Sequence, residues 1–135
     1  MGKIEVKRFS SADETRPFKS HGRVEILNIA GGTVGRAIFE PGWRWSVDVG
    51  PLAGTKSCQM AHSAYVLSGR THVVMDDGAE VDLGPGDYAF IPPGHDGWTV
   101  GDEPCVILDV IGMAEYAKPS RETRTEEASP GSQAH

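Results

Sequence analysis

Apolar residues along this chain come mostly in short runs, separated by turns that are rich in glycine and proline. Such runs predict strands over 24–29, 33–39, 43–49, 58–67, 71–75, 80–83, 88–91, 98–100 and 105–111. In the 43–49 run, tryptophan and valine alternate with Arg44, Ser46 and Asp48, which is the two-residue period of a strand with one buried face. Many short strands of this kind are typical of an antiparallel sandwich or barrel. We therefore expect an all-β protein.

Composition supports a single domain with flanking segments. The chain has 135 residues, of which 17 are glycine and 9 are proline, enough length for one real core and many tight turns. Residues 1–22 mix charges with turn residues and predict an N-terminal arm. Residues 23–116 contain the predicted strands. Residues 117–135 have almost no apolar side chain to bury, so they predict a disordered tail.

The net charge and the two cysteines bear on the partners and the cellular location to be expected. The formal charge of −6 disfavours a surface that follows nucleic-acid phosphates. No apolar run is long enough to cross a bilayer, so we expect no membrane partner and a cytoplasmic location. Cys58 and Cys105 are expected to be reduced thiols there. The apolar face of the 43–49 run is larger than a small barrel can easily fill, which predicts a homodimer.

Chemistry-bearing side chains gather on the 58–67 run. Because alternate residues of a strand share a face, Lys56, Cys58, Met60 and His62 should lie on the same side. His95 follows a Pro-Pro-Gly turn, from which it could reach the same place. One thiolate and two imidazoles suit zinc, copper or iron with a position left open for water or substrate. The competing interpretations are a packing role for Cys58 and a turn-stabilising hydrogen bond for His95.

Two glycine-framed segments carry a resemblance to a known family. The first is Gly50, five residues, Lys56-Ser57-Cys58, three residues, His62, six residues and Gly69. The second is Gly86, five residues, Pro92-Pro93-Gly94, two residues, Gly97, three residues and Gly101. Their spacing resembles the two motifs of the cupin family. The match keeps the glycines and prolines, whereas Lys56, Cys58, His62 and Gly97 stand where that family has its metal ligands.

The resemblance implies a cupin-type antiparallel β-barrel, also called a double-stranded β-helix or jelly roll, with the Cys58 and His62 face pointing inward. It implies a pocket for a small molecule, and one interpretation of that pocket is an enzyme site for a small polar or anionic substrate. A divalent transition metal (zinc, iron, copper, manganese or nickel) would then be held by Cys58, His62 and His95. The alternative is a non-catalytic sensor or binding module.

Roles within that pocket can be assigned to particular residues. His62 and His95 are the candidates for handling a proton in catalysis. The candidates for binding substrate are Lys56, which would steer an anion, Trp98, which would line an apolar wall, and Tyr65, which faces outward unless a bulge reverses the strand. Trp43 and Trp45 could line the same wall or belong to the core. His72 is expected to lie outside the pocket.

Overall fold

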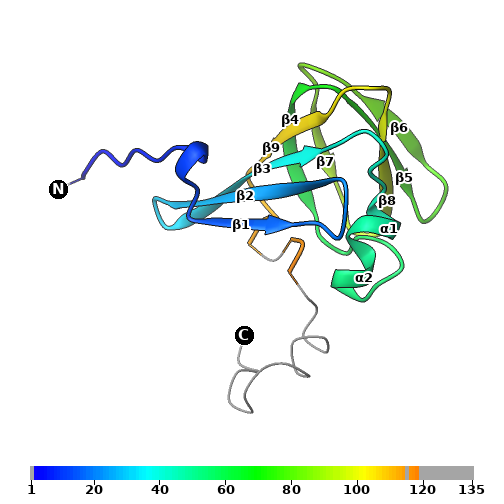
Figure 1. The fold of residues 1–135 in the computed structure, drawn as a ribbon, viewed down its shortest axis with the longest axis horizontal. Helices are drawn as coiled ribbons and strands as arrows, with labels where there is room; N and C mark the ends of the chain where they lie inside the picture. The colour runs from blue at the N-terminus through cyan, green and yellow to red at the C-terminus, as the bar shows by residue number, and fades with distance from the viewer. Residues whose placement is uncertain (1, 115, 119–135) are drawn as a thin grey trace, which may run out of the picture.

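The computed structural model describes residues 2–114 and 116–118. Short strands dominate it, with one 3₁₀ turn and two single-turn helices (Figure 1). The elements in chain order are η1 (Phe9–Ser11), β1 (Glu14–Pro17), β2 (Gly22–Ile29), β3 (Gly32–Phe39), α1 (Trp45–Asp48), α2 (Gly50–Ala53), β4 (His62–Ser68), β5 (Arg70–Met75), β6 (Glu80–Leu83), β7 (Tyr88–Ile91), β8 (His95–Val100) and β9 (Cys105–Asp109). The prediction of an all-β protein is therefore confirmed.

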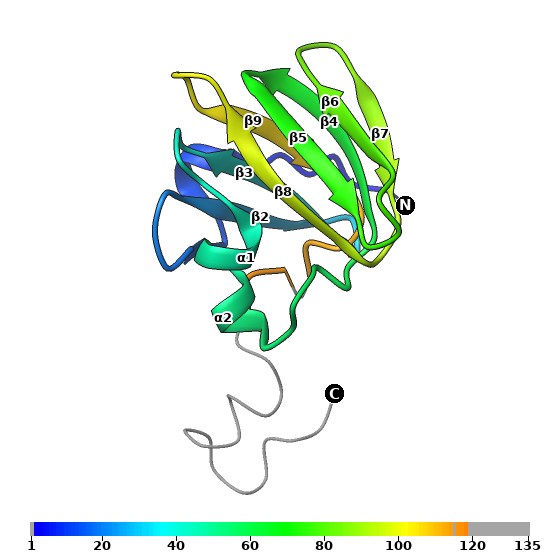
Figure 2. The same cartoon turned by 90° about the vertical axis from the view of Figure 1, so that its right-hand side faces the viewer.

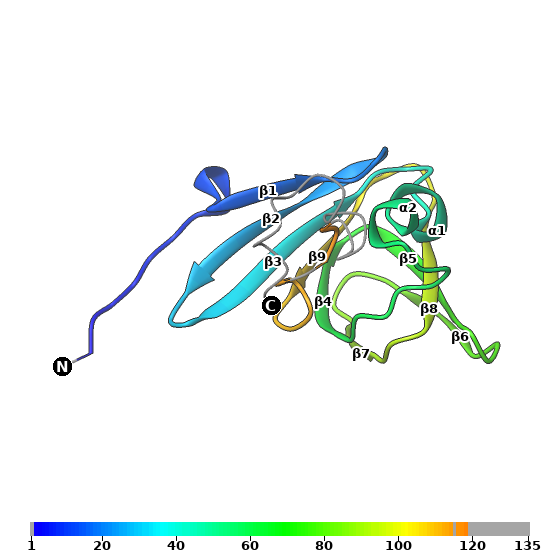
Figure 3. The ribbon, with the colours of Figure 1, turned by 90° about the horizontal axis from the view of Figure 1, so that it is seen from below.

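The strands form two antiparallel sheets that face each other. The six-stranded sheet has the order β1-β2-β3-β9-β4-β7, and the three-stranded sheet has the order β6-β5-β8. Figure 2 shows β5 and β8 in front of β2, β3 and β9. Seen from below, β4 to β8 curl around a central space, while the hairpin of β2 and β3 extends away from them (Figure 3). The architecture is that of a jelly roll.

The predicted barrel is not closed at the strand that follows Pro93. That strand, β8, pairs along its length with β5, and it meets the chain on its other side through isolated bridges at Arg44 and Cys58. The barrel stays open on this side, next to the residues that form the site.

One hydrophobic core fills the space between the sheets. Val24 and Ile26 of β2, Val66 of β4 and Val73 of β5 all belong to it and are at most 7% exposed. The burial alternates along β4, where His62, Ala64 and Val66 are buried. The face of β4 that points into the core is therefore the face that the sequence predicted to be buried.

The predicted strand over 43–49 is instead a turn of helix. Trp45 and Val49 are four residues apart and both are buried, at 2% and 1% exposure, whereas Val47 is 58% exposed. The carboxylate of Asp48 accepts a hydrogen bond from the backbone N–H of Arg44 at 3.0 Å, which satisfies a donor at the start of the helix. A four-residue apolar spacing fits a helix as well as a strand.

This correction removes the argument for a homodimer. The two tryptophans of the run, Trp43 and Trp45, are buried inside their own subunit, so they do not form a free apolar face. The oligomeric state stays a prediction without that support. None of the helices in the described part of the chain has the length and apolar character needed to span a lipid bilayer.

The flanking segments differ from the predicted outline in two places. Within the predicted arm, Glu14–Pro17 forms β1, which pairs with β2 at the edge of the large sheet. Phe18 packs into the core at 5% exposure. The predicted tail begins with Ala117, which is buried, and Lys118. Its remaining residues, 119–135, lie outside the described part.

Candidate metal centre and pocket

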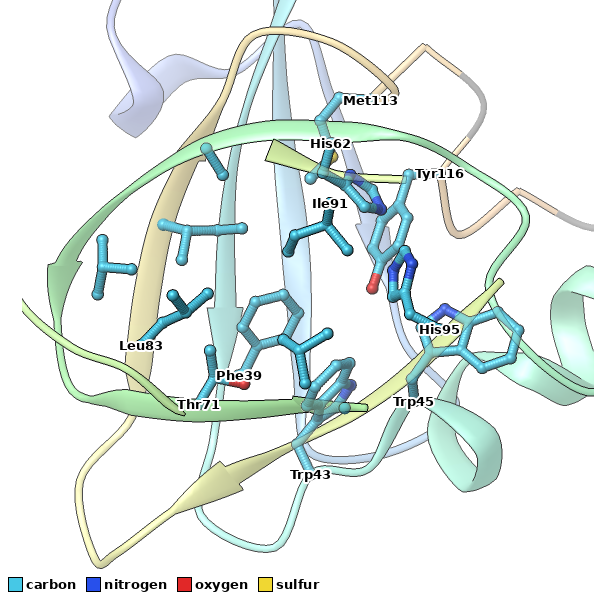
Figure 4. A pocket seen from close by; sticks show the side chains of 15 residues that line it. Phe39, Trp43, Trp45, His62, Thr71, Leu83, Ile91, His95, Met113 and Tyr116 are labelled. Atoms are coloured by element: carbon cyan, nitrogen blue, oxygen red, sulfur yellow. The ribbon is translucent and has the colours of Figure 1, made fainter. Parts of the chain in front are cut away.

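A small cavity lies between the two sheets, at the end where the barrel is open. Its volume is about 50 Å³, which is room for roughly three to five waters. His62 and His95 contribute to one side of it (Figure 4). Most other lining residues are apolar: Phe39, Trp43, Trp45, Ala64, Val66, Val73, Leu83, Ile91, Ile107 and Met113. Such a pocket favours a small ligand with an apolar body.

Cys58, His62 and His95 converge beside this cavity. One candidate ligand atom from each residue lies within 4.8 Å of the other two. The Cys58 sulfur is 3.6 Å from Nε2 of His62, and the two imidazole rings are 5.4 Å apart between centroids. All three side chains are buried. The predicted convergence of the three is therefore found in the structure.

His62 is oriented by a carboxylate that the sequence analysis did not single out. It opens β4, and its Nδ1 is hydrogen-bonded to Asp109 at the end of β9. A carboxylate oxygen can only accept, so Nδ1 carries a proton, and Nε2 is the nitrogen that faces the Cys58 sulfur. Asp109 is 0% exposed and also accepts the backbone N–H groups of Ser63 and Ile111. It is thus fixed in place and holds the ring.

Backbone pairing places Cys58 next to His95. The Cys58 N–H donates to the His95 carbonyl at 2.7 Å, and the Gly94 N–H donates to the Cys58 carbonyl at 2.7 Å. His95 begins β8 rather than lying on a loop, which corrects the predicted location. Its Nδ1 donates to the Pro92 carbonyl at 2.8 Å, so Nε2 is the nitrogen that can interact with the Cys58 sulfur. The predicted turn-stabilising bond and a ligand role are therefore compatible.

The electrostatics of the group favour a thiolate. Burial alone would raise the pKa of Cys58, but hydrogen bonds and charge from His62 and His95 lower it to about 6. Burial would likewise lower the pKa of His62, yet its bonds to Asp109 and Cys58 raise it to about 9. By contrast, burial without such partners raises the pKa of Cys105 to about 12. Without a metal, Cys58 and His62 form a thiolate–imidazolium pair near neutral pH.

The donor set fits a transition metal. A thiolate and two imidazoles that offer their Nε2 atoms are ligands that zinc, copper and iron accept. Asp109 behind His62 and the Pro92 carbonyl behind His95 give both rings the outer hydrogen bond that ligating histidines usually have. Three ligands leave at least one coordination position open. The group could therefore hold a metal with room for a further ligand.

The remaining predicted site residues lie elsewhere. Lys56 is exposed, Tyr65 is 40% exposed on the outer face of β4, and Trp98 stacks on His72 at 4.8 Å outside the cavity. None of the three lines the cavity. The irregularity in β4 falls after Val66, so it does not turn Tyr65 inward. Their proposed contact with substrate stays a prediction that the geometry of the cavity does not support.

Gly97 stands where the resembled family has a histidine ligand. A Cβ built at Gly97 would lie 3.0 Å from the His72 carbonyl oxygen, so a side chain fits only if the neighbouring strand moves. His95, two residues earlier on the same strand, faces the same side as Gly97. This register allows His95 to supply the imidazole in its place.

The segment after β9 brings a residue to the site that the sequence analysis missed. Gly112 has φ of +84°, and a Cβ there would lie 2.2 Å from the Ala61 carbonyl oxygen, so only glycine lets the chain pass so close. Tyr116 then packs edge-on against His62, with 5.2 Å between centroids. Burial and the negative charges of Cys58 and Asp109 raise the pKa of Tyr116 well above its ordinary value, so its hydroxyl stays protonated.

Arg16 of β1 holds this segment in place. Its guanidinium donates to the carbonyls of Met113, Tyr116 and Ala114 at 2.8, 2.7 and 3.0 Å. Its two remaining N–H groups bind the carboxylate of Glu14. All five guanidinium donors are therefore used. A lone carboxylate in the apolar β9 run was a signal for Asp109, but nothing in the sequence linked Arg16 to Tyr116.

Comparison with known proteins agrees with this architecture. The comparison with curated proteins found no match. Among solved structures, the polyketide cyclase RemF from Streptomyces resistomycificus is 20% identical with a TM-score of 0.58, covering 81% of this chain and 79% of that one. A sugar phosphate isomerase of the cupin superfamily from Silicibacter pomeroyi is 24% identical with a TM-score of 0.57, covering 78% and 73%. Oxalate decarboxylase from Lactobacillus farciminis is 17% identical with a TM-score of 0.57, covering 90% and 36%.

These likenesses concern the fold, and the enzymes among them perform different reactions. The family comparison is more direct, since residues 43–111 match the family described as Cupin domain. That range contains Cys58, His62, His95 and Asp109, and it covers half of the chain. The motif spacing, the two-sheet jelly roll and this match agree, and the chain belongs to the cupin family.

Proposed function

We propose that this protein is a metal-dependent cupin enzyme that holds a small, largely apolar molecule beside a metal bound by Cys58, His62 and His95. The observation that supports it most is the convergence of three buried ligand atoms within 4.8 Å, next to an apolar cavity. Each imidazole would offer its Nε2 to the metal, after loss of any proton there, because each Nδ1 already has another partner.

The metal would act as a Lewis acid or lower the pKa of a bound water. The chain's own residues would do the remaining work. Asp109 keeps His62 in one tautomer, the apolar walls exclude bulk water, and Tyr116 offers a proton-bearing hydroxyl next to His62. No lysine or arginine of the described part lines the cavity, so a neutral, mainly apolar substrate fits better than the anion that the sequence suggested.

Metal analysis of protein purified without an affinity tag tests this proposal. We expect close to one transition-metal ion per chain, and its loss in His62→Ala with the fold retained. If wild-type protein carries none, and zinc titrated into it binds no better than to His62→Ala, the metal enzyme is refuted. The alternative, a non-catalytic binding module, would then take its place.

The row of Cys58, His62 and Asp109 supports a second candidate, a cysteine nucleophile. The sulfur, imidazole and carboxylate follow one another as in other thiol enzymes, with 3.6 Å from sulfur to Nε2. However, Cys58 is 1% exposed and does not line the cavity, so substrate would reach it with difficulty. Zinc separates the two candidates, because it should activate the metal enzyme and inhibit a thiolate nucleophile.

A further inference from the structure

The cavity contains hydrogen-bond donors that have no partner. The indole N–H groups of Trp43 and Trp45 are buried and make no hydrogen bond within the described part of the chain. The Tyr116 hydroxyl, a third group that can donate, points into the cavity (Figure 4). These three side chains are 5%, 2% and 4% exposed. A buried donor without a partner is costly, so the two indole N–H groups at one cavity require an explanation.

The other polar groups of the cavity are already satisfied. Thr71 donates its hydroxyl to the Trp98 carbonyl, and Nδ1 of each histidine has its own partner. What remains available to a ligand is therefore a set of neutral donors among the residues that line the cavity. An indole N–H can only donate, and a tyrosine hydroxyl can donate as well as accept. A matching ligand presents acceptor atoms to them.

We propose that the cavity selects a small neutral molecule with a carbonyl group, whose oxygen accepts hydrogen bonds from Tyr116 and the Trp43 and Trp45 indoles. This inference rests on the proposed function, because it takes the cavity as the ligand site. It goes further by naming the recognised group and the residues that recognise it. A carboxylate fits less well, because the walls are apolar and no lysine or arginine of the described part lines the cavity.

Tyr116 can select a ligand because its position is fixed. The guanidinium of Arg16 binds the Tyr116 carbonyl at 2.7 Å, and that of Met113, another lining residue, at 2.8 Å. Arg16 is itself 7% exposed. It is thus a positioning residue, which acts on the ligand through Tyr116.

A pair of probes of equal shape tests the proposal on the metal-loaded full chain. Cyclopentanone has the carbonyl oxygen, and methylenecyclopentane replaces it with a CH₂ group. Binding is followed by NMR through the side-chain N–H signals of the three tryptophans. We expect the ketone to bind at least tenfold more tightly and to shift the signals of Trp43 and Trp45. Trp98 lies outside the cavity and serves as the internal reference.

Substitutions then assign the effect to the donors. Tyr116→Phe should weaken ketone binding about fivefold to tenfold, as for one lost hydrogen bond, and leave the hydrocarbon unaffected. Tyr88→Phe is the matched control, since Tyr88 is 60% exposed and far from the cavity lining. Arg16→Lys should reduce the preference for ketone while zinc still binds.

Equal affinity for the two probes, or no binding of either, overturns the carbonyl proposal. Tighter binding of cyclopentanecarboxylate than of the ketone overturns it too, in favour of an anion. Zinc binding is measured on the same samples. If zinc binds normally in any of these cases, the metal centre stands and only the ligand class is wrong. If the wild-type protein does not bind zinc, the proposed function itself is refuted.

Discussion

His62 and His72 are both held by carboxylates, and of these two only His62 is placed to bind a metal. His62 has one carboxylate, Asp109, on Nδ1, and its Nε2 faces the Cys58 sulfur inside the barrel. His72 on the three-stranded sheet has Asp82 on Nδ1 and Glu80 on Nε2, each at 2.6 Å. Both of its nitrogens are occupied, and its partners are 60% and 61% exposed.

The difference shows what makes a histidine a ligand in this fold. The residue types are the same, but a nitrogen without a carboxylate partner and a second converging donor are present only in the barrel. Burial also matters, because buried charges screened little by solvent interact strongly. At the surface, by contrast, ion pairs contribute little. The predictions below test this contrast.

The largest expected effect comes from removing each histidine. His62→Ala deletes one of three ligands and should abolish detectable zinc binding, whereas His72→Ala should leave zinc affinity unchanged. Isothermal titration calorimetry of the two variants measures this, with circular dichroism to confirm the fold. Equal loss in both variants would mean that the metal does not depend on the barrel group.

A smaller effect is expected from the carboxylates. Asp109→Asn removes the negative charge that holds the His62 ring, so zinc affinity should fall by about 10- to 100-fold, as for other carboxylates behind ligating histidines. Asp82→Asn is the matched control, because it makes the same change next to His72. An unchanged affinity in Asp109→Asn would show that Asp109 has only a structural role.

The number of protons released on zinc binding sharpens the comparison. The pKa of Cys58 is about 6 and the pKa of His62 is about 9. Between these two pH values the thiol is already ionised and the imidazole is still protonated. Zinc must displace the proton on Nε2 of His62, so about one proton should leave per metal bound. Calorimetry in buffers of different ionisation enthalpy counts it. No release near neutral pH would contradict the thiolate–imidazolium pair.

The smallest effect concerns stability at the surface. Hydrogen bonds to Asp82 and Glu80 raise the pKa of His72 above 6.5, so the protonated form stabilises the fold. This contribution is fully present below pH 6.5 and is lost as the pH rises through the raised value. His72→Gln should therefore lower the melting temperature slightly at acidic pH and less at alkaline pH. A larger deficit at alkaline pH would contradict the assignment.

The sequence predicted the fold and part of the site for identifiable reasons. The strands from β4 to β7 follow from alternation and turn residues, which are local signals. Alternation was misleading in the 43–49 run, because Trp45 and Val49, which are four residues apart, lie on one face of a helix as well as on one face of a strand. Cys58 and His62 could be paired because they are close in sequence. Asp109 and Tyr116 reach His62 only through the sheet order β9-β4 and the Gly112 turn, which no local pattern specifies.

Cobalt(II) substitution is the measurement that tests the metal centre most directly. Cobalt bound by a thiolate gives a sulfur-to-metal charge-transfer absorption that nitrogen and oxygen ligands do not. We predict this band in the wild type and in Cys105→Ala, because Cys105 lies apart from the group with its pKa raised to about 12. Cys58→Ser should lack the band. A wild-type protein that binds cobalt without it, or a band that survives Cys58→Ser, would contradict a centre built from Cys58, His62 and His95.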